Sequence, residues 1–225
     1  MRAICRVAVL ILAVWPADAG DITVQVKITR RLTKKSVAPA VYNLRGAAAA
    51  SAAPQPELVN EFDRTVVMLT GKKPAPAEPQ TITIEHRGGR FEPDLAVIPV
   101  GSTVWFPNAD PIFHNVFSLS RSQQFDLGFY PQSKSKSVTF AHAGIVQVYC
   151  HIHANMYAAI VVTDSPWYGK PAADGDISWS NVPAGHYRVS AWHKVAGLYQ
   201  AEVDVPANGK VQVTIHVPLD SERRP

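Results

Sequence analysis

Apolar and polar residues alternate in short runs along most of this chain. The run at residues 22–28 places an apolar side chain at every second position, which is the pattern of a half-buried β-strand. Similar runs rich in Val, Ile, Thr and aromatic residues recur toward the end of the chain, separated by Pro and Gly, and no helical period is sustained. The pattern predicts an all-β protein.

The segment 80–165 carries the most regular of these runs. It contains about seven of them with no helical stretch between, which is typical of an antiparallel β-sandwich. The predicted strands lie at residues 81–84, 96–99, 103–108, 115–117, 137–140, 146–150 and 158–162. We therefore expect one domain at residues 80–165.

Four further runs follow residue 166, at residues 177–179, 186–192, 201–205 and 211–217. Four strands are few for an independent sandwich. We predict that segment 20–79 pairs with segment 166–225, with the domain at 80–165 inserted between them. The flanking strands would then form a second small β-sandwich; the alternative, that the two flanks do not join, stays open.

The chain before residue 80 is less regular. Residues 58–69 space their apolar side chains as on one face of a short helix, but the run ends at Thr70-Gly71 as a strand does, and a strand is favoured. Residues 45–56 are Ala-rich and of low complexity, which predicts a mobile excursion. The prolines of residues 74–79 indicate a stiff linker.

Residues 1–19 have the order of a secretory signal peptide. A positive start is followed by an apolar run from Val7 to Trp15 and by Ala17-Asp18-Ala19, a small-x-small cleavage site. A retained membrane anchor is the alternative, but the run is shorter than the ~20 residues that span a bilayer. We expect cleavage after Ala19, no membrane span afterwards, and a periplasmic or secreted protein.

Charge does not identify a partner. The chain has 22 basic and 18 acidic residues, a net charge of +4, and no stretch combines Lys and Arg with interleaved aromatic residues. A nucleic-acid partner is therefore not expected.

The two cysteines differ in kind. Cys5 lies in the signal peptide and is expected to leave with it, so Cys150 remains as a single thiol in an oxidising compartment. Such a thiol is buried and inert, paired with another chain, or bound to something.

Potential metal ligands surround Cys150 in the sequence. His153 and Met156 follow it at intervals of three residues, and His114 lies upstream at the start of a predicted strand. One thiolate, two imidazoles and a weak axial thioether form the trigonal ligand set of blue copper sites. Sulfur suits Cu(I) and nitrogen suits Cu(II), so this set predicts electron transfer.

These residues resemble the motifs of the cupredoxin family. Residues 101–108 fit Gly-x-x-Val-x-Phe-x-Asn, His114-Asn115 follows, and the short Cys-x-x-His-x-x-Met loop is similar to that of the amicyanins. The resemblance covers residues 80–165 and implies a Greek-key sandwich that binds one type 1 copper ion. His114, Cys150 and His153 would be equatorial ligands and Met156 the axial one, while hydrogen bonds of Asn115 would steady the thiolate and the ligand loops.

The flanks carry a second resemblance. Residues 181–187 are similar to the Val-Pro-x-Gly-x-Tyr signature of carboxypeptidase regulatory-like sandwich modules. The whole arrangement resembles bacterial secreted proteins named for methylamine utilisation, a name that is weak evidence for a substrate.

His151 is the main departure from this family pattern. The run Cys150-His151 resembles multicopper oxidases, but Tyr149 precedes it and no further His-x-His pair exists beyond His151 and His153. Strand alternation directs His151 away from His114. The other histidines are interpreted as surface or satisfied interior residues: His86, His142, His186, His193 and His216.

The resulting hypothesis is a one-electron carrier between a donor and an acceptor redox protein. An enzyme is not expected, because four protein ligands leave no open position for a substrate. The alternatives are copper storage, delivery or sensing, suggested by the additional His151, and a module that binds the cell envelope through its flanks.

Overall fold

The computed structural model describes residues 18–29, 60–71 and 77–217. Within these ranges the chain forms strands, turns and one short 3₁₀ helix, η1 (Glu61–Arg64). The all-β class predicted from the sequence is confirmed. The described part contains no helix long and apolar enough to cross a membrane.

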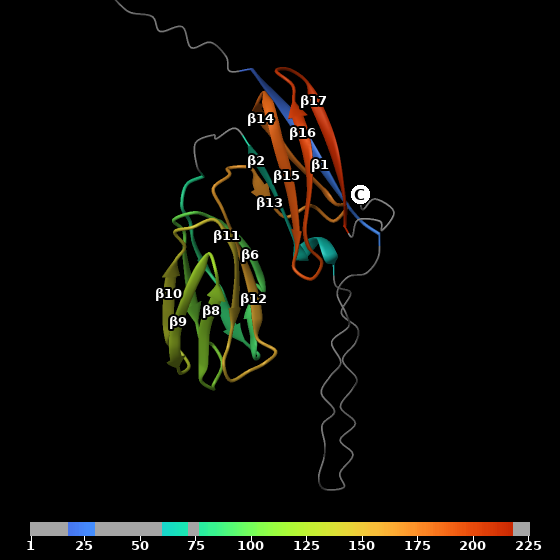
Figure 1. The fold of residues 1–225 in the computed structure, drawn as a ribbon. Coiled ribbons are helices and arrows are strands. Elements are labelled where there is room, and N and C mark those ends of the chain that lie inside the picture. Colours follow the sequence, from blue (N-terminus) through green and yellow to red (C-terminus); the bar gives the residue numbers. More distant parts are fainter. Residues whose placement is uncertain (1–17, 30–59, 72–76, 218–225) are drawn as a thin grey trace, which may run out of the picture.

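Residues 81–163 form a sandwich of two main sheets (Figure 1). The larger sheet has the order β6-β12-β11-β8-β9, from β6 (Leu95–Pro99), β12 (Tyr157–Thr163), β11 (Gly144–Tyr149), β8 (His114–Ser120) and β9 (Gln123–Tyr130). The smaller has the order β10-β7-β3, from β10 (Ser135–Thr139), β7 (Thr103–Pro107) and β3 (Thr81–Thr83). A hairpin of β4 (Glu85–Arg87) and β5 (Arg90–Glu92) adjoins them.

The apolar side chains of this sandwich form one core. Its buried members from the central strands include Val104 and Phe106 of β7, Val146 and Val148 of β11, and Ile160 of β12. Because alternate residues of a strand point to opposite faces, Val146, Val148 and the position of Cys150 share the inward face. The strand pattern thus brings the Cys150 thiol to the edge of the core.

The remaining strands form a second sandwich that joins the two ends of the chain. One sheet has the order β14-β1-β17, from β14 (Asp176–Pro183), β1 (Ala19–Ile28) and β17 (Lys210–Val217). The other has the order β13-β2-β15-β16, from β13 (Tyr168–Gly169), β2 (Thr65–Gly71), β15 (Gly185–His193) and β16 (Gly197–Val205). β1 pairs in parallel with β17, and β2 pairs antiparallel with β15. Strands before residue 72 therefore pair with strands after residue 166.

A third apolar cluster fills the seam between the two sandwiches. Val66 of β2 and Trp192 of β15 pack with Leu95, Ala159 and Val161 of the first sandwich. β12 is buried on both faces as a result, which explains its continuous apolar sequence. Each sandwich thus covers apolar surface of the other.

Some expectations need correction. The segment 58–69 was predicted as a strand, but Glu61–Arg64 is 3₁₀ helix, begun by the Asn60 side chain that accepts a hydrogen bond from Phe62 N, and the strand begins at Thr65. β9 was not predicted, because its polar and glycine positions weaken the alternation. Of the predicted signal peptide 1–19, residues 1–17 lie outside the described residues, and Ala19 is the first residue of β1. The low-complexity segment 45–56 also lies outside the described residues. The predicted domain boundaries stay predictions.

Candidate metal centre

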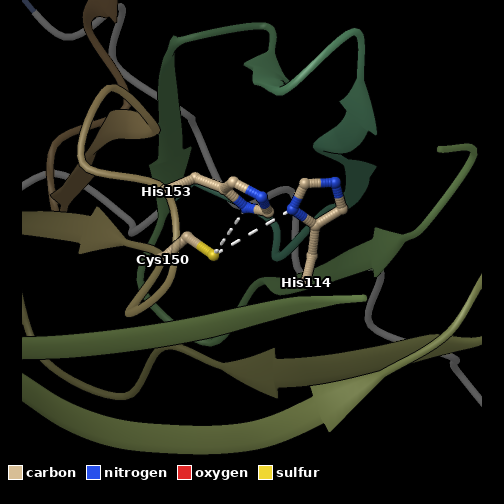
Figure 2. A group of neighbouring side chains, drawn as sticks. All are labelled: His114, Cys150 and His153. Carbon is tan, nitrogen blue, oxygen red and sulfur yellow. Dashed lines mark hydrogen bonds between the residues drawn. The ribbon is translucent and has the colours of Figure 1, made fainter. Parts of the chain in front are cut away.

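Three predicted ligands come from two neighbouring strands and the loop between β11 and β12. His114 is the first residue of β8, Cys150 directly follows β11, and His153 lies in the turn before β12. β8 and β11 are adjacent, with Tyr149 opposite Phe117. Figure 2 shows both imidazole rings directed toward the Cys150 sulfur.

The three ligand atoms lie close enough to share one ion. Cys150 Sγ is 3.6 Å from His153 Nδ1 and 4.0 Å from His114 Nδ1, and all three ligand atoms lie within 4.8 Å of one another. With a metal–sulfur bond of about 2.3 Å, a metal–nitrogen bond of about 2.0 Å and about 120° between them, sulfur and nitrogen would lie about 3.7 Å apart. The two sulfur–nitrogen separations fit ligands of one metal ion.

Met156 lies beneath the same loop. Its side chain is buried in the cluster that also contains Cys150, and its N–H donates to His153 O at 3.0 Å, which closes a tight turn. The turn keeps the thioether on the core side of the ligand loop. Its coordination of a metal stays a prediction.

Asp110 fixes the orientation of His114, and the sequence analysis missed it. His114 Nε2 lies 2.9 Å from Asp110 Oδ2, and both residues are buried. A carboxylate can only accept here, so Nε2 carries the proton and the Nδ1 lone pair is left for a metal. Burial lowers the pKa of His114, with the hydrogen bond to Asp110 opposing, which favours the neutral ligand form.

The Asp110 carboxylate is itself held by a glycine turn. Gly88 N and Gly89 N donate to its two oxygens at 2.7 and 2.8 Å. Both glycines have positive φ, 60° and 67°, which residues with a side chain rarely adopt. Burial alone would raise the pKa of Asp110, but these hydrogen bonds, with that of His114, outweigh it and lower the pKa. The Gly88-Gly89 dipeptide, together with an Asp four residues before a ligand His, was the available signal.

Asn115 contacts both the thiol and the surrounding loops. Its N–H donates to Cys150 Sγ at 3.5 Å, its Nδ2 donates to Asp126 Oδ1 at 2.7 Å, and its Oδ1 accepts from His151 N at 3.4 Å. The hydrogen bond from Gly128 N, followed by that from Asn115, lowers the pKa of Asp126. Asn115 thus ties β8 to β9 and to the residue after Cys150, and its effect on a bound metal stays a prediction.

His151 lies outside the ligand cluster. Its ring stacks on Phe117 at 3.8 Å between centroids and 4° between planes, its Nε2 lies 3.3 Å from Asp126 Oδ2, and 46% of its side chain is exposed. These contacts explain the position of the His151 ring, and none of them involves the ligand cluster.

His86 was expected to be a surface or satisfied interior residue and is neither. It is fully buried beside His114, with ring centroids 5.0 Å apart, and its Nδ1 has no hydrogen-bond partner among the described residues. Burial and the neighbouring His114 lower its pKa to about 4, so the ring is neutral. No spacing in the sequence distinguished it from the other histidines.

Two of the other histidines fulfil their expected structural roles in the described chain. His193 is buried between Glu61 and the N–H groups of Val195 and Ala196. His186 is exposed and its pKa is raised by the hydrogen bond to Asp204.

Known proteins resemble the chain only in part. No protein-family model and no curated protein sequence matches it. Among solved structures, a mutant amicyanin in its reduced state is 25% identical, covering 37% of this chain and 82% of that chain, with a TM-score of 0.34. A second mutant amicyanin, in the Cu(I) form, is 23% identical, covering 37% of this chain and 82% of its own, with a TM-score of 0.35.

A Cu-containing nitrite reductase from Thermus scotoductus SA-01 is also similar. It is 25% identical over 42% of this chain and 27% of its own, with a TM-score of 0.36. TM-scores of this size do not establish a shared fold over the whole chain. The chemistry of the site therefore rests on its own residues.

Proposed function

We propose that this protein is a periplasmic or secreted type 1 copper protein that carries single electrons between two redox proteins. The observation that carries this proposal is the convergence of Cys150 Sγ with His114 Nδ1 and His153 Nδ1 within 4.8 Å. Met156 is proposed as the weak axial ligand, from its burial in the same cluster.

The set of ligand atoms suits a metal ion that changes oxidation state while its ligands stay where they are. Bound copper would supply the one-electron step, since thiolate stabilises Cu(I) and imidazole stabilises Cu(II). Cys150 and His114 are held by adjacent strands, and Asp110 fixes the His114 ring. Ligands that do not move between oxidation states reduce the reorganisation that accompanies electron transfer.

The surface around His153 supports exchange with a partner. His153 is half-buried, and Ile112, Phe113 and Ile152, which flank the ligands in sequence, are 47%, 56% and 50% exposed. Exposed apolar residues beside the ligands in sequence suit a brief protein contact, because apolar side chains carry no charge that must be desolvated. We propose this face for the donor and acceptor.

Electrochemistry tests the proposal. The copper-loaded protein is expected to give reversible one-electron voltammetry, fast electron self-exchange and slow loss of copper to a chelator. If the protein stores or delivers copper, we expect ready loss of copper to the chelator and slow electron self-exchange. That result would overturn the carrier proposal. An envelope-binding module predicts association with envelope fractions whether copper is bound or not.

A further inference from the structure

His86 is a buried imidazole that does not belong to the ligand cluster of His114, Cys150 and His153. It is fully buried in the middle of β4, and its Nδ1 has no hydrogen-bond partner among the described residues. An unpaired polar atom in a core is unfavourable, and an apolar residue would avoid it. The unpaired Nδ1 contributes nothing to the packing, so any role of His86 must come from the contacts of its ring.

The plane of the His86 ring is fixed by its neighbours. Tyr130 Oη donates its proton to Phe106 O at 2.9 Å, so it can only accept from His86 Nε2, which lies 3.4 Å away. Phe91 packs edge-on against the same ring, with centroids 5.0 Å apart. The ring is thus held in one orientation.

His86 contacts the segment that carries His114 at two points. Its carbonyl accepts a hydrogen bond from Ala109 N at 3.0 Å, and its ring lies 5.0 Å from the His114 ring at an interplanar angle of 65°. Asp110 joins the same segment to the Gly88-Gly89 turn of the β4–β5 hairpin. The β4–β5 hairpin is therefore hydrogen-bonded to the segment 109–114 that carries the ligand His114.

We propose that His86 is a positioning residue whose flat ring keeps the His114 ring turned with Nδ1 toward Cys150. Asp110 holds the far nitrogen of His114, and the ring of His153 makes a second contact at 4.6 Å between centroids. The His86 ring packs against the His114 ring and limits how far the His114 ring can tilt about its hydrogen bond to Asp110. This inference rests on the proposed function, because it concerns the ligand that His114 would supply.

Replacement of the ring tests this role in the full chain. His86→Leu fills similar volume without a flat ring, and His86→Phe restores the ring without its nitrogens. In the metal-free protein, we expect the His114 Nε2 proton to exchange with solvent faster in His86→Leu, as measured by NMR, and to keep wild-type protection in His86→Phe. In the Cu(I)-loaded protein, we expect roughly 10-fold faster loss of copper to a chelator for His86→Leu, and the wild-type rate for His86→Phe.

A buried histidine elsewhere provides the control. His193→Phe is expected to lower the unfolding temperature but to change neither the exchange of the His114 proton nor the loss of copper. His86→Ala gives a second ringless variant if His86→Leu does not fold. Wild-type exchange and copper loss in a folded ringless variant would overturn the proposal, and so would loss of protection in His86→Phe equal to that in His86→Leu.

The outcomes separate this inference from the proposed function. A wild-type protein that binds no copper would contradict the function, and proton exchange in the metal-free protein would still decide the role of His86. A blue protein with unchanged His86 variants would contradict the role of His86 alone.

Discussion

Asp110 Oδ2 lies 2.9 Å from His114 Nε2, and the same carboxylate accepts N–H bonds from Gly88 and Gly89. Asp110→Asn replaces one acceptor with an amide donor, so it breaks this arrangement while keeping the size of the side chain. We expect copper affinity to fall by roughly 10- to 100-fold, the range for partners of metal-bound histidines. Competition with a chelator measures it.

Asp174→Asn is the matched control for this prediction. Asp174 also accepts a backbone N–H bond, from Asp176, but it is exposed and lies in the second sandwich. Its substitution is expected to leave copper affinity unchanged. Equal affinities of Asp110→Asn and the wild type would show that His114 is oriented without the carboxylate.

Met156 is buried with Cys150 in one cluster, and its replacement is expected to tune the reduction potential. Met156→Leu removes a donor that stabilises the more highly charged ion, so the potential is expected to rise while the blue colour remains. Met156→Gln adds an oxygen donor and is expected to lower the potential. Voltammetry measures both, with Met68→Leu at the seam as the control; identical potentials in all four proteins would remove Met156 from the ligand set.

The sequence predicted the strands of the main sheets well because their apolar alternation is strong. β12 was recognised from its unbroken apolar run. The 3₁₀ helix η1 was missed because the strand-like end of its run at Thr70-Gly71 outweighed the helical spacing of the apolar residues before it. The cluster of His114, Cys150 and His153 was predicted from residue type and spacing, and the structure brings these three together.

Asp110 and His86 could not be assigned in the same way. Each acts through a contact between segments distant in sequence, Asp110 with the Gly88-Gly89 turn and His86 with Tyr130. Such contacts depend on where the β4–β5 hairpin packs. The Gly88-Gly89 dipeptide and the spacing of Asp110 from His114 were a signal for the first contact, but no local pattern indicated the contact of His86. The seam between the sandwiches was missed for the same reason.

Protonation of the buried His193 is expected to lower the free energy of unfolding in mild acid. Burial lowers its pKa below the ordinary 6.5, with Glu61 opposing, and its Nδ1 must accept from Val195 N and Ala196 N. The unfolded chain therefore takes up this proton first as pH falls, so the stability contributed by His193 is present above about 6.5 and is lost below it.

Urea unfolding at about pH 7.5 and about pH 5 measures this dependence. His193→Gln is expected to be less stable than the wild type at the higher pH but to lose less on acidification. His142→Gln, at an exposed position, is expected to retain the wild-type dependence. An unchanged acid loss in His193→Gln would assign the effect to other groups.

Lys194 joins the two sandwiches through Asp94. Its Nζ lies 2.6 Å from Asp94 Oδ2, also donates to Asp94 O and Tyr157 O, and its side chain is only 4% exposed. Asp94→Asn leaves this buried cation without its counter-charge, although the 41% exposure of Asp94 allows partial screening by water. We expect a loss of about 1–2 kcal/mol in the free energy of unfolding.

Glu92→Gln provides the comparison for the seam. Glu92 has a loose surface pair with Arg87 at 3.9 Å, and its substitution is expected to have little effect in urea unfolding. Equal stabilities of Asp94→Asn and Glu92→Gln would mean that the apolar seam alone holds the sandwiches together.

The visible and EPR spectra of the Cu(II)-loaded protein test the central claim most directly. A thiolate bound in a trigonal site with two imidazoles gives an intense visible band and narrow copper hyperfine splitting. We predict both for the wild type, and their loss in Cys150→Ala even where copper remains bound. A wild-type protein with one copper ion per chain and no such band would contradict the assignment of His114, Cys150 and His153 as a blue copper site.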